Sequence, residues 1–363
     1  MANIFALAGI TASDYQFVNT VGQQLTYELT KQYLERVNLD MQLSLSMFVQ
    51  GTTTKFQERY QLPGGGRMQE IGRLARPAVV RATGSFTVGY PLQGFGDAVA
   101  ADRVDMAYMS TAEYERHVDS VVIRDRNEVR FRILRALFKS TDTSIEDPER
   151  GAITVKPLAN GDSVLYPPVL GSSSEATDNH YLESGYAAAA ISDSNNPLVT
   201  LRNEIEEHFG TQTGGNNIVV FCNNAQSEQL GALTDFVSIV DYRVRAGANV
   251  DTPMGVPPNI PTTARVLGVS NGCWVVEWRF IPANYLVAVD ADQPAPLKMR
   301  VDPPETGLPL GLQLVARETL NPMETAIWEH RYGFGVANRL NGAVMELGTG
   351  GTYTIPTSPE DYS

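Results

Sequence analysis

Cysteine, histidine and long apolar runs are all scarce in this chain. Its 363 residues include only Cys222 and Cys273, and no CxxC pair is present. Two cysteines cannot build a disulfide framework, so a reducing compartment is expected. No run approaches the 18 apolar residues that indicate a transmembrane helix. The sequence therefore argues against a disulfide-stapled domain and predicts no membrane partner.

The charge balance is acidic. Lys and Arg total 28 and Asp and Glu total 41, which gives a net charge of 28 − 41 = −13. A general nucleic-acid binder usually carries a basic surface, so this balance disfavours that class. Hydrophobic residues make up 43% of the chain, which is enough for a sizeable core.

The four histidines are His117, His180, His208 and His330. No two lie at metal-ligand spacing and none forms HExxH, so each is expected at the surface or with a single hydrogen bond. Glu206-Glu207-His208 suggests an acid/base cluster, but the polar end of a helix, solvated on one face, explains it better. The sequence predicts no catalytic residue, no cofactor and no metal.

One catalytic motif needs an explanation. Gly268–Gly272 matches G-x-S-x-G around Ser270, which in α/β-hydrolases requires a strand, a sharp turn and then a helix. Here the strand-like run Cys273–Trp278 follows, and Asn271-Gly272 favours a tight hairpin turn. A hairpin is the preferred interpretation, and a cytosolic serine hydrolase using Ser270 is the alternative. Its triad partners would be Asp290 or Asp292 and His330.

The clearest helix is predicted over Thr111–Lys139. Ser110 can cap it, and Glu113 completes a capping box. Its length would be roughly 40 Å, so it needs a large partner surface. Apolar residues recur at spacings of three and four along one face: Tyr114, Val118, Val121, Val122, Val129, Ile133 and Leu137.

The same helix carries five arginines: Arg124, Arg126, Arg130, Arg132 and Arg135. Glu128 is four residues from both Arg124 and Arg132 and can pair with them. A nucleic-acid face is another interpretation. Because the acids on the helix cannot pair with all five, we expect some of these arginines to reach acids on a neighbouring subunit.

The N-terminal half contains two further elements. Residues 11–39 predict an arm with a helix whose apolar residues, Phe17, Val21, Leu25 and Leu29, recur every four positions and pack on something outside the helix. Residues 47–92 predict a long two-stranded hairpin, with strands over Thr52–Leu62 and Val79–Val88 and a Gly-rich tip at Pro63–Gly66. An isolated ribbon is marginal in water, so it implies a partner.

The C-terminal half predicts a compact α+β unit and further strands. The expected helices run from Asn196 to Phe209, ending at Gly210, and from Ser227 to Val240. The expected strands lie within Asn217–Cys222, Arg265–Val289, Gly311–Glu318 and Ala326–Leu347.

In this order, the segments resemble the major capsid proteins of tailed double-stranded DNA bacteriophages, whose fold is shared with encapsulin shells. The local strings that carry the resemblance are Gly84–Leu92 with Phe95-Gly96-Asp97, Val219–Asn224 and His330–Asn338. The resemblance implies an α+β fold with an N-terminal arm (1–46), an E-loop hairpin (47–92), a P-domain (93–186) with a spine helix (111–139), an A-domain (187–310), and a return to the P-domain with a C-terminal tail (311–363).

The resemblance also implies a structural role. Many copies would assemble through pentamers and hexamers into an icosahedral virion capsid that encloses double-stranded DNA without sequence-specific binding, formed in the host cytoplasm. An encapsulin-type nanocompartment shell is the alternative. No long charged N-terminal coiled coil is present in this sequence, so a separate scaffolding protein is expected, with a portal as a further partner. The alternative is a fused scaffold segment that has been cleaved from the chain. Whether a decoration protein binds is left open.

The predicted inter-subunit contacts are the five arginines of the long helix and four ribbon residues: Lys55, Phe56, Arg59 and Tyr60. Some capsid proteins of this type cross-link a lysine on the E-loop to an asparagine of a neighbour. Lys55 is the only lysine within residues 47–92. Because no motif for its partner is found, cross-linking is not expected.

Overall fold

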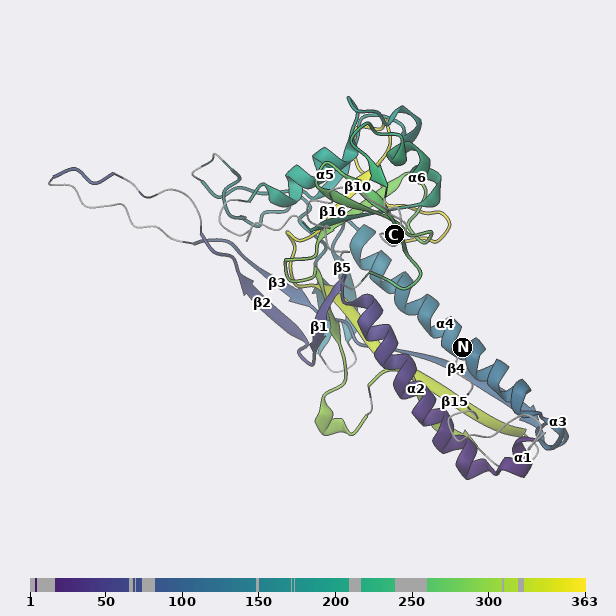
Figure 1. Ribbon diagram of the computed structural model, residues 1–363. Coiled ribbons are helices and arrows are strands. Elements are labelled where there is room, and N and C mark those ends of the chain that lie inside the picture. The colour runs from purple at the N-terminus through teal and green to yellow at the C-terminus, as the bar shows by residue number, and fades with distance from the viewer. Residues whose placement is uncertain are drawn as a thin grey trace.

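The computed structural model describes Ile4 and residues 17–64, 68, 70–73, 82–147, 150–170, 172, 174–208, 217–238, 260–308, 310–318 and 323–363. The molecule is elongated (Figure 1). Two long helices, α2 (Gln23–Leu45) and α4 (Thr111–Phe138), run along one arm, and a body built on a sheet lies at the other end. A ribbon of β2 (Gln57–Gln61) and β3 (Ser85–Gly89) projects to one side.

A five-stranded sheet runs under the long helices. Its central strand, β15 (Met323–Val336), pairs antiparallel with β4 (Gln93–Asp102), β14 (Gln313–Glu318) and β13 (Leu297–Arg300). The edge strand β1 (Val49–Thr53) pairs parallel with β13. Short α1 (Val18–Val21) and α3 (Arg103–Tyr108) lie near its far end.

A seven-stranded sheet forms the core of the body. Its strand order is β7 (Tyr181–Glu183), β16 (Ala343–Glu346), β12 (Tyr285–Asp290), β8 (Ile218–Cys222), β11 (Cys273–Glu277), β10 (Arg265–Ser270) and β9 (Val237–Ser238). Residues of α5 (Pro197–Glu206) and α6 (Asn224–Gly231) pack on one face. The remaining short elements are the hairpin β5 (Thr143–Asp147) and β6 (Gly151–Val155) and the 3-10 turns Ala188–Ala190 and Pro304–Thr306.

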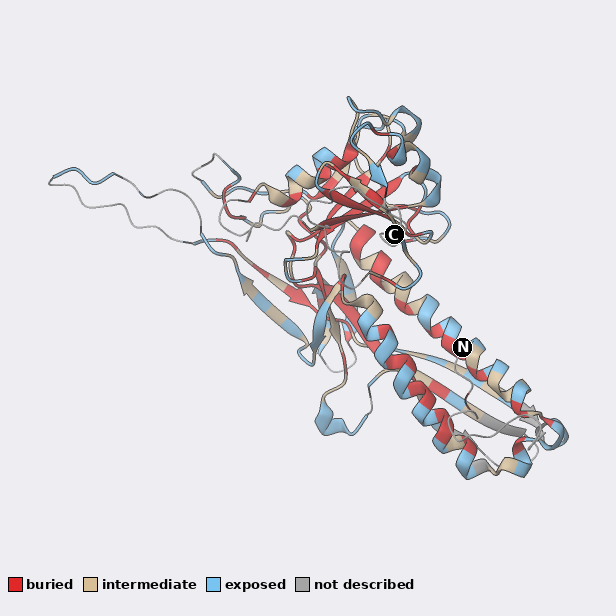
Figure 2. Ribbon diagram, in the orientation of Figure 1, coloured by how far each residue is buried: buried red, intermediate tan, exposed pale blue. Residues whose placement is uncertain are grey.

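The predicted long helix is confirmed as α4. The Ser110 side chain accepts a hydrogen bond of 3.2 Å from the Glu113 backbone N–H, which satisfies one free donor of the first turn. Its predicted apolar stripe is buried from Val118 to Leu137, and Tyr114 is partly buried (Figure 2). Val118 and Val122 lie in one cluster with Trp328 of β15, so the helix packs on the five-stranded sheet, as expected.

The N-terminal helix exists but packs differently from the prediction. Leu25 is 39% exposed, whereas Leu29, Tyr33 and Val37 are buried. A strict four-residue spacing drifts around a helix of 3.6 residues per turn, so only part of the predicted line faces inward. Tyr33 donates a hydrogen bond of 2.8 Å to Asp119 on α4. The partner of this helix is therefore its own chain.

Two helix ends in the body differ from the prediction. α5 begins at Pro197 under the cap of Asn196, as predicted, but ends at Glu206. The predicted end at Phe209 and Gly210 lies outside the described residues. The helix predicted over Ser227–Val240 exists with other bounds: α6 begins at Asn224 and ends at Gly231, and Val240 lies outside the described residues. The backbone N–H of Thr234 donates to Asp193 at 2.9 Å, which directs the chain out of the helix and into β9.

The strands predicted in the C-terminal half and the hairpin turn at Asn271-Gly272 are confirmed. Asn271 and Gly272 have φ angles of 51° and 78° between β10 and β11, as a tight hairpin requires. Among the described helices, none is both long and apolar enough to cross a lipid bilayer.

Candidate functional site

The ribbon is confirmed as a two-stranded antiparallel hairpin, but it starts later than predicted. β2 pairs with β3 so that Tyr60 lies opposite Phe86, and their rings stack at 5.3 Å. The predicted first strand began at Thr52, but residues up to Thr53 belong to β1 in the five-stranded sheet. Gly65, Gly66 and the predicted return strand over residues 79–81 lie outside the described residues.

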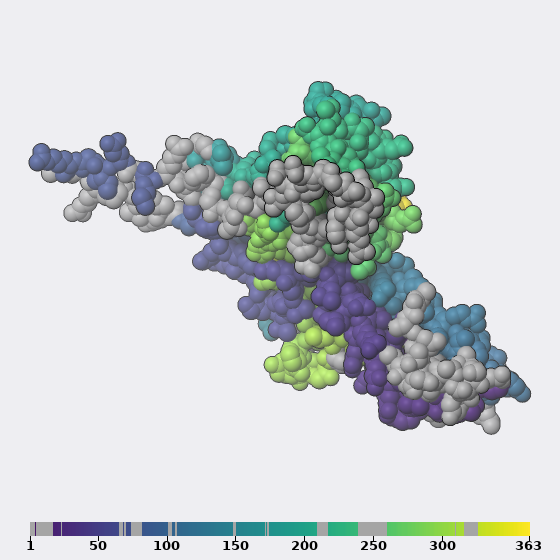
Figure 3. All heavy atoms as spheres, in the orientation of Figure 1, coloured from purple at the N-terminus to yellow at the C-terminus, as the bar shows by residue number. Residues whose placement is uncertain are grey.

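A small apolar cluster fixes the ribbon at its base. Phe86, Val88 and Tyr90 are buried against Tyr60, Leu62 and Val164. A Cβ atom at Gly84 would lie 2.0 Å from the Leu165 carbonyl oxygen. The backbone just before β3 therefore lies directly against the loop that contains Val164 and Leu165. Further out, Met68 and Ile71 are 103% and 58% exposed. In Figure 3, the described segment 70–73 lies well away from the body.

A polar clasp adds to this anchor. Glu58 accepts hydrogen bonds from Tyr60 at 2.5 Å and Lys298 at 3.0 Å, and pairs with Lys55 at 2.9 Å. Burial by itself would raise the pKa of the Glu58 carboxyl, but these three donors outweigh it and lower the pKa to about 2. Burial raises the pKa of Tyr90, whose hydroxyl lies 2.6 Å from that of Tyr60. The clasp joins the ribbon to β13.

The four ribbon candidates therefore divide into two pairs. Phe56 lies 5.5 Å from the Arg300 guanidinium and is half-buried, and Tyr60 belongs to the clasp. Both hold the ribbon to its own chain. Lys55 has a 68% exposed side chain, and Arg59 is exposed and donates to Ser85 at 3.1 Å. Lys55 and Arg59 are the pair that faces outward.

Four of the five arginines on α4 find partners within the chain. Their partners are Asp97 for Arg124 (2.6 Å), Glu360 for Arg130 (2.8 Å), Glu128 for Arg132 (2.7 Å) and the Ser363 carbonyl for Arg135 (2.7 Å). Glu128 thus pairs with Arg132, as predicted, while Arg124 turns to β4 instead. Arg126 is exposed and has no ion pair within the described residues. Inter-subunit contact by these side chains remains a prediction.

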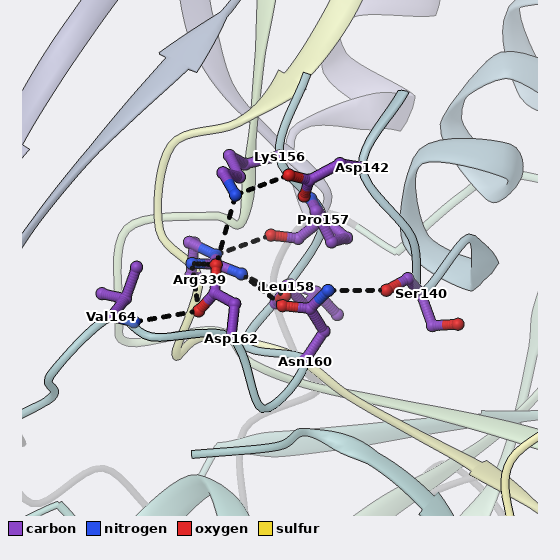
Figure 4. Close-up of polar contacts among 9 residues, drawn as sticks. All are labelled: Ser140, Asp142, Lys156, Pro157, Leu158, Asn160, Asp162, Val164 and Arg339. Carbon is purple, nitrogen blue, oxygen red and sulfur yellow. Dashed lines mark hydrogen bonds and ion pairs between the residues drawn. The ribbon is translucent and has the colours of Figure 1, made fainter. Parts of the chain in front are cut away.

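Arg339 was not identified from the sequence, yet its side chain holds in place the loop 157–164, which packs against the ribbon (Figure 4). The side chain is buried and donates to the carbonyls of Pro157 and Leu158, at 2.8 and 3.0 Å, and to Asp162, at 3.0 Å. Asp162 in turn accepts from the Val164 backbone N–H at 3.3 Å. Because Val164 packs on the ribbon cluster, Arg339 positions the surface on which the ribbon rests. The sequence offered no clear signal for this role, because the contacts of Arg339 lie in a loop about 180 residues upstream.

The histidines correct another prediction. His117 is exposed, but His180, His208 and His330 are buried. His208 therefore does not lie on a solvated helix face. Burial would raise the pKa of Asp178, but its hydrogen bonds with His180 and His208 outweigh burial and hold the pKa well below its ordinary value.

The hydrolase geometry is not formed. Ser270 is 1% exposed and ends β10 at the hairpin turn, so no helix follows it. Its proposed partner His330 lies in β15, in the other sheet, and its Nδ1 is 2.7 Å from Asp125 on α4. A hydrogen bond from Asn271 to Ser270 Oγ, 3.1 Å long, is part of the turn.

Comparison with known proteins identifies the fold. The structure is similar to a solved chain from Mycobacterium phage Patience, with a TM-score of 0.63 and 23% identity over 96% of this chain and 94% of that one. This chain therefore shares the fold of that solved chain. The predicted α+β fold is thereby confirmed.

Weaker similarities are found to a chain of the bacteriophage PhiM1 mature capsid (TM-score 0.48, 12% identity, 81% and 83% of the two chains) and to a virus-like particle from Pyrococcus furiosus (TM-score 0.40, 13% identity, 87% and 100%). No family model and no curated protein matches the sequence.

Proposed function

We propose that this chain is the structural subunit of an icosahedral capsid that encloses double-stranded DNA in a virion. The observation that carries the proposal is the projecting ribbon on a fold shared with a phage chain along nearly the whole length of both. The base of the ribbon is fixed by the cluster and the clasp, but Met68 and Ile71 beyond it are exposed. Exposed apolar side chains held away from the body of their own chain fit a neighbouring subunit.

The domain division of such a subunit applies here as part of the proposal. The E-loop is the ribbon, the spine helix is α4, and the A-domain is the body with the seven-stranded sheet. The two sheets share segments: β7 and β16, from ranges predicted as P-domain, join the seven-stranded sheet, and β13, from the A-domain range, joins the five-stranded one. Because the two sheets share segments, the body and the part of the molecule that holds α2 and α4 form one unit, with no flexible linker between them among the described residues.

Electron microscopy of the expressed full-length chain tests the proposal, alone and together with a scaffolding protein encoded beside it. Closed icosahedral particles, or pentamers and hexamers, are the expected result. A protein that stays strictly monomeric at high concentration in both preparations would contradict it. A non-enzymatic role predicts in addition that Ser270→Ala changes no activity and that active-site serine reagents do not label the protein.

The encapsulin-type compartment is the second candidate, because that shell type shares the predicted fold. Its contents distinguish it. Particles purified from the natural source should contain double-stranded DNA if the chain is a capsid subunit, and a protein cargo if it is a compartment shell. The portal and scaffolding partners belong to the capsid proposal alone.

A further inference from the structure

Two histidines from separate segments direct their Nε2 atoms at one carboxylate. His180 lies just before β7, and His208 lies just after α5. Their Nε2 atoms are 2.7 and 2.8 Å from the same oxygen, Oδ2 of Asp178. Oε1 of Glu207 lies 3.9 Å from Nε2 of His208. One potential ligand atom from each of these four residues lies within 4.8 Å of all the others.

Backbone carbonyls fix both imidazole rings. Nδ1 of His180 lies 2.8 Å from the Gly342 carbonyl oxygen, and Nδ1 of His208 lies 2.9 Å from that of Pro167. A carbonyl oxygen only accepts, so each Nδ1 carries a proton, and Nε2 is the atom left to face the carboxylates. In metalloproteins, the same bond from Nδ1–H to a carbonyl sets the tautomer and orientation of a histidine ligand.

The burial of both histidines distinguishes two explanations of these contacts, one without a bound cation and one with it. The side chains of His180 and His208 are 0% and 2% exposed. Without a cation, both Nε2 atoms need a proton to bond Oδ2 of Asp178, which places two buried imidazolium charges on one carboxylate oxygen. Burying charges in this way carries a large desolvation penalty. With a divalent cation, both imidazoles stay neutral and their Nε2 lone pairs become ligands.

We propose that Asp178, His180, Glu207 and His208 bind a divalent transition-metal cation, and that Zn²⁺ fits this site best. Two imidazole nitrogens and two carboxylate oxygens form a four-coordinate donor set that zinc accepts. The 2.7 and 2.8 Å separations from Oδ2 are about 0.6 Å shorter than the roughly 3.3 Å between neighbouring ligands of tetrahedral zinc. On binding, the Asp178 carboxylate would turn slightly away from both rings, and Glu207, at 3.9 Å from His208, would move in by about the same amount.

The location of the site indicates a structural role. His180 leads into β7 at the edge of the seven-stranded sheet, while Glu207 and His208 follow the helix that covers this sheet. A cation here would tie the end of α5 to the sheet edge. Glu207, at 29% exposure, is the most open of the four side chains and marks where the cation enters. This inference does not depend on the proposed capsid function.

The metal content of the untagged full-length chain tests the site directly. Protein incubated with excess ZnCl₂ and then gel-filtered in metal-free buffer should retain about one zinc per chain by elemental mass spectrometry, whereas MgCl₂ should leave no bound metal. Cobalt(II) in place of zinc should give the visible absorption of a four-coordinate site. Folded wild-type protein that retains no zinc above the buffer background would overturn the proposal.

Variants assign the metal to these residues. His180→Gln, His208→Gln and Glu207→Gln should each weaken zinc binding at least tenfold, since even changes behind the ligands have effects of that size. His330→Gln is the matched control, because it removes a buried histidine that contacts Asp125 instead, and it should retain zinc like the wild type. Equal zinc retention by the wild type and all three site variants would place the metal elsewhere and overturn the assignment.

A stability measurement covers the case in which a histidine variant does not fold. Wild-type protein treated with a chelator should melt at a lower temperature and recover when zinc is added back. Glu207→Gln changes the most exposed of the four side chains and should fold, but it should not recover at the same zinc concentration. Identical melting of chelated and zinc-loaded wild-type protein would contradict a structural zinc.

Discussion

Arg130 on α4 and Glu360 in the C-terminal segment form an ion pair of 2.8 Å. Two residues further on, Tyr362 is fully buried, with its ring 5.5 Å from Phe131 and 5.4 Å from Phe138. Arg130 and the neighbouring Arg135, both proposed as inter-subunit contacts, thus hold a segment of their own chain. Residues 360–363, here called the C-terminal brace, pack along the C-terminal half of α4.

We expect Tyr362→Ala to destabilise the subunit by about 3 kcal/mol, because it removes a buried aromatic ring from between two others. Urea unfolding of the unassembled protein measures the change. Tyr108→Ala is the matched control, since Tyr108 is 71% exposed, and it should change the free energy of unfolding by less than about 0.5 kcal/mol. Equal effects of the two substitutions would show that the C-terminal brace does not contribute to stability.

Charge reversal separates the two kinds of arginine on α4. Arg126→Glu should leave the free energy of unfolding within about 0.5 kcal/mol of the wild type and yet lower the yield of assembled particles, because Arg126 is exposed. Arg130→Glu should instead destabilise the subunit itself by about 1–2 kcal/mol, since it repels Glu360 and removes the cation held 3.9 Å from the Phe280 ring. Unchanged assembly with Arg126→Glu would remove that residue from the interface.

The exposed segment around Ile71 offers the clearest test of assembly. Ile71→Asp should reduce particle yield at least tenfold with no change in the melting temperature of the free subunit, because the side chain is 58% exposed. Tyr60→Asp should lower both, since it breaks the clasp that holds the ribbon to β13. Particle yield by sedimentation and melting by calorimetry distinguish the two. Normal assembly of the Ile71 variant would show that this segment is not a contact.

The clasp also predicts a pH dependence. The pKa of Glu58 is about 2 in the folded chain and 4.5 ordinarily, so the folded state binds its proton less readily than the unfolded one. Its contribution to stability is therefore complete above about pH 5 and is lost as the pH falls from 4.5 towards 2. Wild type should be more stable than Glu58→Gln at pH 7, and the difference should narrow steadily from pH 5 to pH 3.

A matched substitution controls for charge alone. Glu305 is exposed, so Glu305→Gln should follow the wild type across the same pH range. Urea unfolding at pH 7, 5, 4 and 3 measures all three proteins. A difference between wild type and Glu58→Gln that stays constant with pH would contradict the role assigned to the Glu58 carboxylate.

Local sequence determined several elements. Ser110 and the apolar spacing from Val118 to Leu137 predict α4 to within one residue of its end, because capping and periodicity act within a few turns. Asn271-Gly272 likewise predicts its hairpin, since the required φ angles suit these two residues. Together with the order of the segments, these features also predicted the fold class.

Tertiary structure decided the rest, because those contacts join residues that are distant in the sequence. The partners of Arg130 and Arg135 come from the C-terminal segment, and the buried Arg339 supports a ribbon that begins far upstream. His180 and His208 share Asp178 only because α5 ends beside the start of β7. Sequence spacing does not predict this contact, because the packing of α5 on the seven-stranded sheet brings the two segments together. The sequence by itself therefore determined the elements and the fold class, and packing decided which charged side chains face outward and which hold the chain together.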